Sequence, residues 1–264
     1  MSAVLAIPEV RVSPALYVYG LTLAQVSAPD LAQMIGVGGG NIELRPLGNF
    51  SAIVEPIHPE DFGRDVTEHQ HDPPWLLERT TRHDAVLRAY LGGGVLPLRF
   101  GTVVSQVSAL LGWLERSPQL VSQLERLRGA AEWTLRLWIA ESALIEPSDP
   151  QLTDFDQRIA AASPGKRYLL ERQRELHVAG RVPELARAQR GIWQSKIAEL
   201  VQQVTLIDRL PQTRAGLVAL LEVVVLAGAD WNWAAQMPWA TSGVHVEVSG
   251  PYAPYHFVGE ELSP

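Results

Sequence analysis

Residues 132–139 constrain the fold most, because apolar side chains recur there at every second position. The apolar positions are Trp133, Leu135, Leu137 and Ile139, and they are separated by Thr134 and Arg136. A period of two places the two sets on opposite faces of an extended chain. The pattern therefore predicts a β-strand with one buried face.

The segments after this strand follow a definite order. Hydrophobic periodicity predicts helical segments at 166–178 and 184–201, with a break or kink at 180–183. We expect the rest to form strands at 204–210, 216–226 and 244–248 and a short helix at 231–240. The order strand, long helix, strand, strand, short helix, strand is that of a ferredoxin-like βαββαβ arrangement. It predicts a four-stranded antiparallel sheet backed by helices.

The first half of the chain has a different pattern. We expect a poorly ordered lead-in at 1–14, strands at 15–19, 41–45 and 50–55, a helix at 27–36, an irregular stretch at 56–74, and helices at 75–91, 105–116 and 118–127. The second and third strands should form a hairpin. The predicted fold class is α+β with two domains. Residues 1–128 form an N-terminal mixed α+β domain, and residues 129–264 form a C-terminal ferredoxin-like domain with an aromatic and proline-rich tail.

Composition narrows the classes of function. The chain has 264 residues, 47% of them hydrophobic, and a net charge of -7, which fits a globular protein and argues against a nucleic-acid binder. It has no cysteine, which excludes disulfides, iron–sulfur clusters and cysteine nucleophiles. The most hydrophobic stretch, 216–228, is too short to span a bilayer, and the first eight residues lack a secretory pattern. We expect a soluble cytoplasmic protein.

Residues 95–102 connect two helical stretches and contain one arginine. Three glycines precede this segment, and Pro97 cannot donate a hydrogen bond to a sheet, so we expect it at a sheet edge or a strand end. Arg99 has apolar neighbours on both sides, and partial burial would require an acidic partner or carbonyl groups. Arg99 is then either a structural residue paired with Glu132 or another acid, or an anion receptor exposed in a cleft.

Two histidine-containing stretches are candidates for chemistry. The stretch Glu68-His-Gln-His-Asp72, with His58 nearby, could bind zinc, but no third ligand has a typical spacing, and a solvated polar loop is the competing interpretation. Arg82, His83 and Asp84 are neighbours on a predicted helix, so their side chains diverge. We expect His83 at the edge of the core, bonded to a backbone carbonyl, and we expect no catalytic residue, metal or cofactor.

Two further features have structural interpretations. The glycine-rich runs 36–40 and 92–94 match neither a dinucleotide fingerprint nor a phosphate-binding loop, so we interpret the first as a flexible turn. Trp231, Trp233 and Trp239 crowd one short stretch. They form either a lid over the last sheet or a surface for a partner.

Several strings, taken together and in order, resemble the gas vesicle protein F/L family, and most nearly its F members. They span residues 17–258. The residues that carry the resemblance, and that we expect to form structural or partner-binding motifs, are Tyr17, Tyr19, Gly20, Arg82, His83, Pro97, Leu98, Arg99, Phe100, Gly101, Glu132, Trp133, Gly250, Pro251, Pro254, Tyr255 and Phe257.

The resemblance implies a non-enzymatic accessory protein of the gas vesicle, inside the cell, that acts as a minor structural component or an assembly factor. The implied partner is the small, very hydrophobic major shell protein, and other gas vesicle accessory proteins are further candidates. Nucleic acid, lipid membrane and small-molecule substrates are not expected. The resemblance also implies a C-terminal domain of modified ferredoxin type.

Two hypotheses follow from different classes. In the first, an open edge of the ferredoxin-like sheet accepts a strand from the shell protein. The aromatic tail, with Tyr252, Tyr255 and Phe257 between prolines, then packs across the junction of the domains as a clamp, or contacts the partner directly. In the second, the protein is a non-catalytic ferredoxin-like module that binds a small molecule or an anion through Arg99.

Overall fold

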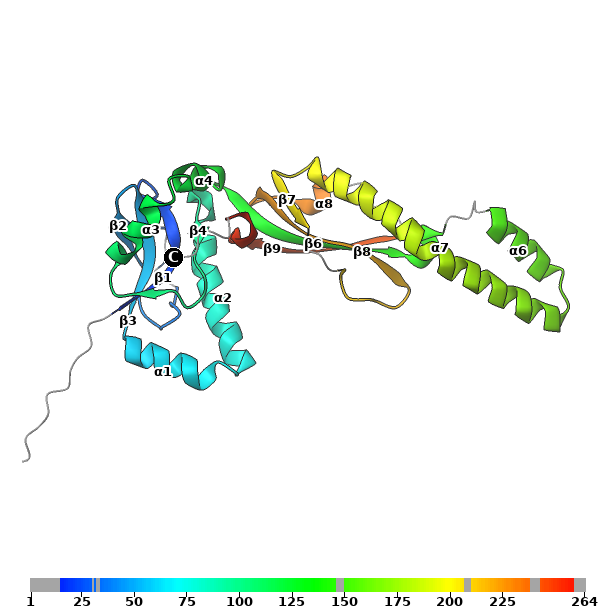
Figure 1. Cartoon of the computed structure of the whole chain (residues 1–264), viewed down its shortest axis with the longest axis horizontal. Coiled ribbons are helices and arrows are strands. Elements are labelled where there is room, and N and C mark those ends of the chain that lie inside the picture. Colours follow the sequence, from blue (N-terminus) through cyan, green and yellow to red (C-terminus); the bar gives the residue numbers. More distant parts are fainter. Residues whose placement is uncertain are drawn as a thin grey trace, which may run out of the picture. The chain divides into compact units, whose positions relative to one another are not determined.

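The computed structural model describes residues 15–29, 31, 34–145, 150–206, 210–237 and 243–258 (Figure 1). These residues form two compact units. The first unit contains the described residues within 1–132 and 251–264, and the second contains those within 133–250. The predicted lead-in at 1–14 lies outside the described residues. Each unit is described separately below.

The first unit is built on a five-stranded sheet. Its strands are β1 (Ala15–Leu23), β2 (Glu43–Leu47), β3 (Phe50–Ile57), β4 (Leu96–Pro97) and β5 (Val103–Val104). They are ordered β2-β3-β1-β4, with β5 also paired to β1, and these pairs are antiparallel. The predicted strands and hairpin are confirmed. Gly48, at a φ of 64°, makes the tight turn between β2 and β3.

Helices pack on this sheet. They are α1 (Pro59–His69), α2 (Pro73–Ala89), α3 (Leu111–Glu115) and α4 (Leu120–Arg126), with short 3₁₀ turns η1 (Leu91–Gly93) and η2 (Val107–Leu110). Both α2 and α4 contact β1, whose residues are almost all buried. The prediction of an irregular stretch at 56–74 is wrong. Prolines occupy the first turns of α1 and α2, where a missing N–H is tolerated, so they start these helices.

The predicted helix at 27–36 is not present in the residues described there. Residues 27–29, 31 and 34–36 have no regular secondary structure, and residues 30, 32 and 33 lie outside the description. The glycines that follow hold a specific loop, described below, in place of the expected flexible turn.

The second unit contains a four-stranded sheet and a long helix. Its elements are β6 (Ala130–Ala140), α5 (Glu141–Leu144), α6 (Pro150–Ala160), α7 (Pro164–Ala198), β7 (Gln203–Leu206), β8 (Leu217–Gly228), α8 (Trp233–Gln236) and β9 (Val244–Tyr252). The strand order is β7-β8-β6-β9. The predicted strands and the short helix occur in the predicted order. Residues 207–209 and 238–240 of the predicted elements lie outside the described residues.

Of the predicted break or kink at 180–183, the break is wrong, because α7 continues through Pro183 as one helix of 35 residues, and the kink stays a prediction. An internal proline loses one hydrogen bond and crowds the preceding turn, at about 3 kcal/mol. Packing on both sides of Pro183 offsets this, since Leu170 and Ile197 are buried at opposite ends of the helix. The helix α6, absent from the prediction, packs against α7.

The alternation in β6 is confirmed on one face, where Leu135 and Leu137 are fully buried. On the other face Thr134 and Arg136 are half-buried. Trp138 on that second face is also buried, because the Arg214 guanidinium lies 3.9 Å from the centre of its ring.

The chain passes between the units twice, within β6 and within β9. The sequence predicts a boundary at 128/129 and assigns the tail to the C-terminal domain. In the structure the division falls after Glu132, and residues 251–258 group with the first unit. The tail ends in a 3₁₀ turn, η3 (Tyr255–Phe257), whose contacts with the first unit account for this grouping.

Candidate functional site

Two tyrosines on β1 define the centre of the site. Tyr17 and Tyr19 are fully buried, with ring centroids 4.9 Å apart in an edge-to-face arrangement. A bulge between Val18 and Gly20 leaves Tyr19 without an opposing residue on β3. Gly20 is required next, because a Cβ there would lie 2.5 Å from the Leu96 carbonyl of β4. The two buried tyrosines of β1 and the close approach of β4 therefore depend on the same four-residue string, Tyr17 to Gly20.

His83 on α2 lies between two tyrosine hydroxyl groups. Its Nδ1 is 2.8 Å from the Tyr17 hydroxyl, and its Nε2 is 2.8 Å from the Tyr255 hydroxyl. The Tyr17 hydroxyl also accepts the Gly101 N–H at 3.2 Å. We therefore assign the Tyr17 hydroxyl as the donor to His83 Nδ1, and we place the single imidazole proton on Nε2, which donates to the Tyr255 hydroxyl. This neutral tautomer satisfies both nitrogens.

Burial sets the protonation of the cluster. Burial lowers the pKa of His83 to about 4, and a hydrogen bond with the Leu98 backbone opposes this weakly. Burial also raises the pKa of Tyr17, Tyr19 and Tyr255 above the ordinary range. All four groups are therefore neutral at pH 7. His83 is buried and not at the edge of the core as expected, but the expected hydrogen bond with a backbone group is present, at Leu98. Both ring nitrogens also meet tyrosine hydroxyl groups, because β1 and the tail approach His83 from two sides.

A buried carboxylate extends the cluster on the other side. Glu55 of β3 is fully buried and accepts the Tyr19 hydroxyl at 2.6 Å. It also accepts the N–H groups of Gly38 at 3.1 Å and Gly40 at 2.6 Å. Successive backbone N–H groups that surround a carboxylate supply the donors that a buried anion needs. The loop at 36–40 thus has a specific role as a carboxylate nest.

The glycines in this loop are required by space. A Cβ on Gly36 would overlap the Glu55 carboxylate, and one on Gly38 would lie 2.9 Å from Ile57. Two arginines of α2 fix the outside of the loop, with Arg79 bonded to the Val37 carbonyl and Arg82 to the Gly36 carbonyl. Glu55 was missed by sequence reasoning. A lone acidic residue within an apolar strand, near a run of glycines, was the available signal.

The segment after β4 closes one side of the cluster. Gly101, at a φ of 88°, turns the chain so that its N–H reaches Tyr17. The Phe100 ring lies edge-on to His83 at 5.8 Å. Leu98 is buried and donates its N–H to the Tyr19 carbonyl at 2.9 Å. Arg99, in contrast, is exposed.

The expected burial of Arg99 and its pairing with Glu132 are therefore wrong. Arg99 follows buried Leu98 and points to the opposite, exposed side, and no side-chain partner of Arg99 occurs among the residues that the structure describes. Glu132 has a different partner. Its carboxylate accepts the backbone N–H of His256 at 2.9 Å and lies 2.9 Å from the His256 Nδ1.

The tail covers the remaining side. Besides the contact between Tyr255 and His83, the Arg126 side chain donates to the Phe257 carbonyl at 3.1 Å. Arg88 lies over the Tyr252 ring at 4.8 Å. Burial raises the pKa of Asp84, while the Arg88 ion pair and a backbone hydrogen bond from Ala253 lower it. The tail is thus anchored within the first unit along one face of α2.

The residues that carry the resemblance do not all meet here. Pro97 is buried in β4 next to the cluster, and Pro254 is buried in the tail. Trp133 and Gly250 belong to the second unit, while Pro251 begins the tail segment of the first. Within the second unit, the Trp133 ring lies 6.1 Å from Trp233 and its indole N–H donates to the Gly228 carbonyl at 3.2 Å.

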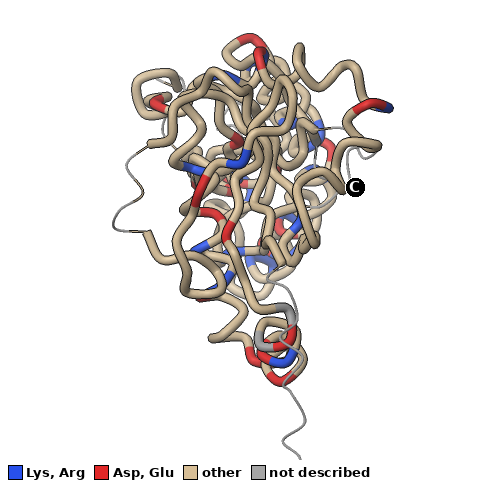
Figure 2. The backbone as a smooth tube through the Cα atoms, turned by 90° about the vertical axis from the view of Figure 1, so that its left-hand side faces the viewer, with Lys and Arg blue, Asp and Glu red and all other residues tan. Residues whose placement is uncertain are grey.

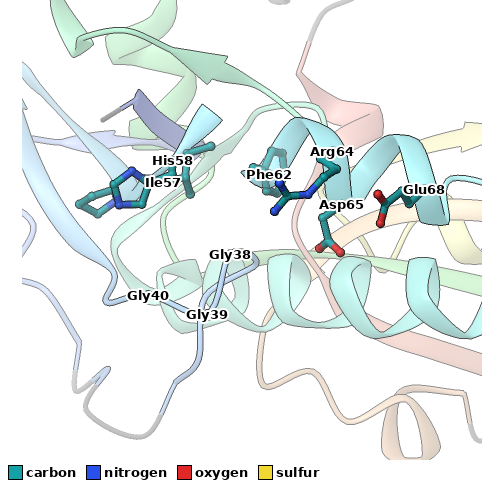
Figure 3. A pocket seen from close by; sticks show the side chains of 10 residues that line it. Gly38, Gly39, Gly40, Ile57, His58, Phe62, Arg64, Asp65 and Glu68 are labelled. Carbon is teal, nitrogen blue, oxygen red and sulfur yellow. The ribbon is translucent and has the colours of Figure 1, made fainter. Parts of the chain in front are cut away.

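A cavity of about 540 Å³ lies beside the glycine loop, between it, the end of β3 and α1 (Figure 3). It is lined by Gly38, Gly39, Gly40, Pro56, Ile57, His58, Phe62, Arg64, Asp65 and Glu68. Asp65 contacts both Arg79 and His69, so its charge is already compensated. Within the described ranges, no three His, Cys, Asp or Glu residues are grouped to hold a metal ion.

The described residues show neither a concentrated basic region nor a helix suited to a membrane. Acidic and basic residues are interspersed along the chain, with no extended basic run (Figure 2). None of the described helices is long and apolar enough to cross a membrane.

The cluster at His83 is arranged to hold segments together. Its hydroxyl, imidazole and carboxylate groups are paired with one another or with backbone N–H groups, so they link β1, β3, α2, the Gly101 turn and the tail. Fully satisfied buried polar networks make a core rigid and specific. The geometry therefore supports a structural role, in which the cluster holds these segments together.

Comparison with known proteins identifies relatives along nearly the whole chain. The model of the family "Gas vesicle synthesis protein GvpL/GvpF" matches residues 15–259. Gas vesicle protein L of Streptomyces sp. (strain CB03234) is 28% identical over 244 residues, 85% of each chain. Gas vesicle protein F of the same strain is 28% identical over 255 residues, covering 92% of this chain and 98% of that protein.

Two crystal structures share the fold. Gas vesicle protein GvpF from Anabaena sp. PCC7120 superposes with a TM-score of 0.56 at 16% identity, covering 93% of this chain and 96% of that one. GvpF from Microcystis aeruginosa gives a TM-score of 0.56 at 19% identity, with coverage of 92% and 98%. At these identities the likeness concerns the fold, which is α+β with antiparallel sheets.

Proposed function

Because the chain belongs to the gas vesicle synthesis protein GvpL/GvpF family, we propose that it supports gas vesicle formation by binding the hydrophobic major shell protein. It acts without catalysis, inside the cell, as an assembly factor or a minor structural component. The family match over residues 15–259 carries this proposal. The interlocked His83 cluster is compatible with it, because its polar groups serve to join segments.

We infer that the two units are separate domains and that the second is ferredoxin-like. The element order β6, helices, β7, β8, α8, β9 supports this, as does the strand order β7-β8-β6-β9. In a βαββαβ unit the second and fourth strands are the edges. Here these are β7 and β9. The strand β6 is an interior strand.

The edge strand β9 is the best docking edge for an extended segment of the shell protein. It has nine residues, whereas β7 has four. The β2 edge of the other sheet has Pro46 within a strand of only five residues, whereas the proline of β9, Pro251, is the residue before the last one of a nine-residue strand. An unpaired strand edge offers a row of N–H and C=O groups that can bind an added strand. A shell subunit held in this way would be protected from aggregation until it joins the growing shell.

Proline substitutions along β9 test the proposal. Each of His245, Val246, Glu247 and Val248 is replaced in turn, and each variant is co-expressed with the shell protein. At alternate positions the N–H points away from β6, so proline there should leave the fold intact and abolish co-purification with the shell protein. Folding is checked by circular dichroism. Unchanged co-purification of every folded variant would refute this edge as the docking site.

The alternative function, anion binding through Arg99, has less support. Arg99 is exposed on a turn, and the cavity of about 540 Å³ is lined by neither Arg99 nor His83. Replacement of Arg99 by Gln should therefore leave co-purification with the shell protein unchanged.

A further inference from the structure

The edge strand β9 carries its one acidic residue in the middle. Among the described residues, β9 is paired with β6 on one side and with no strand on the other. Its nine residues contain a single Asp, Glu, Lys or Arg, which is Glu247. Natural sheets commonly place a charged side chain on an edge strand, because the charge prevents another strand from pairing there. Glu247 would protect β9 in this way if its carboxylate were free at the open side.

The carboxylate of Glu247 is instead held towards the interior of the sheet. Arg214 Nη2 lies 2.5 Å from Glu247 Oε2, and Arg136 Nη1 lies 3.4 Å from Glu247 Oε1. Arg136 belongs to β6, the inner neighbour of β9, and the Arg214 guanidinium lies over the ring of Trp138, also on β6. The hydrogen bond from Arg214 is the main cause of a lowered pKa of Glu247, so the carboxylate is ionised at pH 7.

The two arginines are themselves fixed in position. Arg136 also lies 3.3 Å from the buried carboxylate of Glu222 on β8, so it bridges the strands on both sides of β6. Arg214 belongs to a loop that is attached to β6, since the Trp138 indole N–H donates to the Gln212 carbonyl at 2.9 Å. Two arginines thus balance two carboxylates on this face of the sheet.

The side chains of β9 indicate what kind of strand fits beside it. Arg136 contacts both Glu247 and Ser249, so these two residues share one face of the sheet. Val246 and Val248 lie on the opposite face, because successive residues of a strand alternate, and both are half-buried. Side chains of an added strand lie beside those of the strand it joins. A segment with apolar residues at alternate positions and uncharged residues between them is therefore favoured.

The β2 edge of the first unit shows the opposite arrangement. Arg45 and Glu43 form an ion pair at 2.5 Å, and both belong to β2 itself. Their side chains are 49% and 38% exposed. The charges therefore stay beside any strand that approaches β2, whereas the charge on β9 is drawn inward.

We propose that Arg214 and Arg136 act as positioning residues that keep the β9 edge open for an uncharged, extended segment of the shell protein with apolar side chains at alternate positions. This proposal rests on the proposed docking at β9 and adds the reason why that edge accepts a strand. Without Arg214, the carboxylate of Glu247 can turn to the open side, where an added strand would have to remove its water.

Arg214→Met tests the proposal, because methionine keeps an apolar side chain on the Trp138 ring while it releases Glu247. The probe is a fluorescein-labelled peptide of alternating valine and threonine, and its binding to the full-length chain is measured by fluorescence anisotropy. Arg214→Met should weaken binding by about fivefold or more, and Glu247→Gln should keep it within about twofold of wild type. The double variant Arg214→Met/Glu247→Gln should restore binding, because the released carboxylate is then absent.

A merely structural role for Arg214 would give a different pattern. If Arg214 only held its loop in place, binding by the double variant would stay weak, and that result would overturn the proposal. Unchanged binding by Arg214→Met, or no binding of the peptide to wild type, would also overturn it. The matched control is Arg45→Met, which releases Glu43 on the β2 edge and should leave peptide binding unchanged.

Co-purification of the same variants with the shell protein separates this inference from the proposed function. The expected pattern with the peptide, but no co-purification of wild type, would reject the shell protein as the partner and leave the role of Arg214 intact. Co-purification that is undiminished in Arg214→Met would retain the proposed function and overturn this inference. Sedimentation should show no dimer that Arg214→Met disperses, and such a dimer would overturn the proposal in favour of pairing between two copies of β9.

Discussion

At the scale of single residues, His83 shows how a polar side chain is accommodated in the core. It is 3% exposed and neutral, with one tyrosine hydroxyl on each ring nitrogen. A buried imidazolium would be desolvated, and both of its nitrogens would be donors. The hydrogen bond from Tyr17 to Nδ1 is possible only in the neutral form. The protonation state and the packing of the cluster therefore depend on each other.

Stability should fall in acid because of this histidine. Its pKa is about 4 in the folded chain, below the ordinary value of 6.5, so the unfolded state binds more protons between these values. The stabilising contribution is complete above pH 6.5 and is lost as the pH falls towards 4. We expect a loss of about 3 kcal/mol over this window. Urea denaturation at several pH values measures it.

The matched variants for this experiment are His83→Gln and His71→Gln. The first should flatten the pH dependence of the free energy of unfolding between pH 6.5 and 4. The second removes an exposed histidine and should retain the wild-type slope. A His83→Gln variant with the same slope as wild type would show that His83 does not control acid stability.

Removal of the Tyr17 hydroxyl should also destabilise the first unit. Tyr17→Phe leaves the Gly101 N–H and the His83 Nδ1 without their partner, and a buried unsatisfied group costs about 1–3 kcal/mol. Tyr168→Phe is the control, because that hydroxyl belongs to a side chain that is 69% exposed. Thermal denaturation should show a lower midpoint for Tyr17→Phe alone, and equal midpoints would contradict the assigned network.

At the scale of elements, hydrophobic periodicity predicts strands better than it predicts the helices and loops of this chain. Alternation located β6, and the β-branched runs located β1, β3 and β8, because a half-buried or buried strand needs these patterns. Prolines misled the prediction in α1 and α7, since they can start a helix or be tolerated within one that is well packed. Their effect depends on tertiary contacts that a local pattern does not contain.

The same limit applies to the site. The strings around Tyr17, His83 and Tyr255 were identified as motifs, but nothing in their spacing indicated that one histidine joins two tyrosines 238 positions apart in the chain. The glycine loop looked flexible because its partner, the Glu55 carboxylate, comes from a separate strand. Arg99 was expected to be buried because its neighbours are apolar, but adjacent side chains of an extended segment point to opposite sides, and Arg99 is exposed while Leu98 is buried.

The carboxylate nest gives a prediction at this scale. Gly36→Ala should destabilise the first unit by about 2–4 kcal/mol, since a Cβ there displaces the buried Glu55 carboxylate from its donors. Gly63→Ala is the control, because nothing lies near a Cβ in that part of α1, and helix propensity favours Ala by about 1 kcal/mol. Chemical denaturation should give changes of opposite sign. A loss of stability in both variants would argue against the nest.

The internal proline of α7 gives another prediction. Pro183→Ala should restore a backbone hydrogen bond within the helix and raise local stability by up to about 3 kcal/mol. Hydrogen–deuterium exchange should slow in peptides covering residues 179–187 and stay unchanged in peptides covering α2. Faster exchange around the substitution would mean that Pro183 stabilises the helix at its position.

At the scale of the whole molecule, the first unit is discontinuous in the chain. Residues 133–250 form the second unit, and the tail then contributes Tyr255, His256 and Phe257 to the first. We expect a chain that ends at Gly250 to lose stability in the first unit, since His83, Glu132 and Arg126 lose partners. Limited proteolysis should cut the first unit of this variant much faster than that of wild type. Equal rates of cleavage would contradict a structural role for the tail.

The return of the tail has a consequence during synthesis. The ribosome must translate the whole second unit before Tyr255 emerges to reach His83. In a nascent or prematurely terminated chain, His83 lacks its Tyr255 partner, and the residues that the tail would cover stay exposed. Chaperones and proteases can bind a first unit in this state. Only a chain translated as far as residues 251–258 can close the first unit, so folding of this unit waits for synthesis of the second.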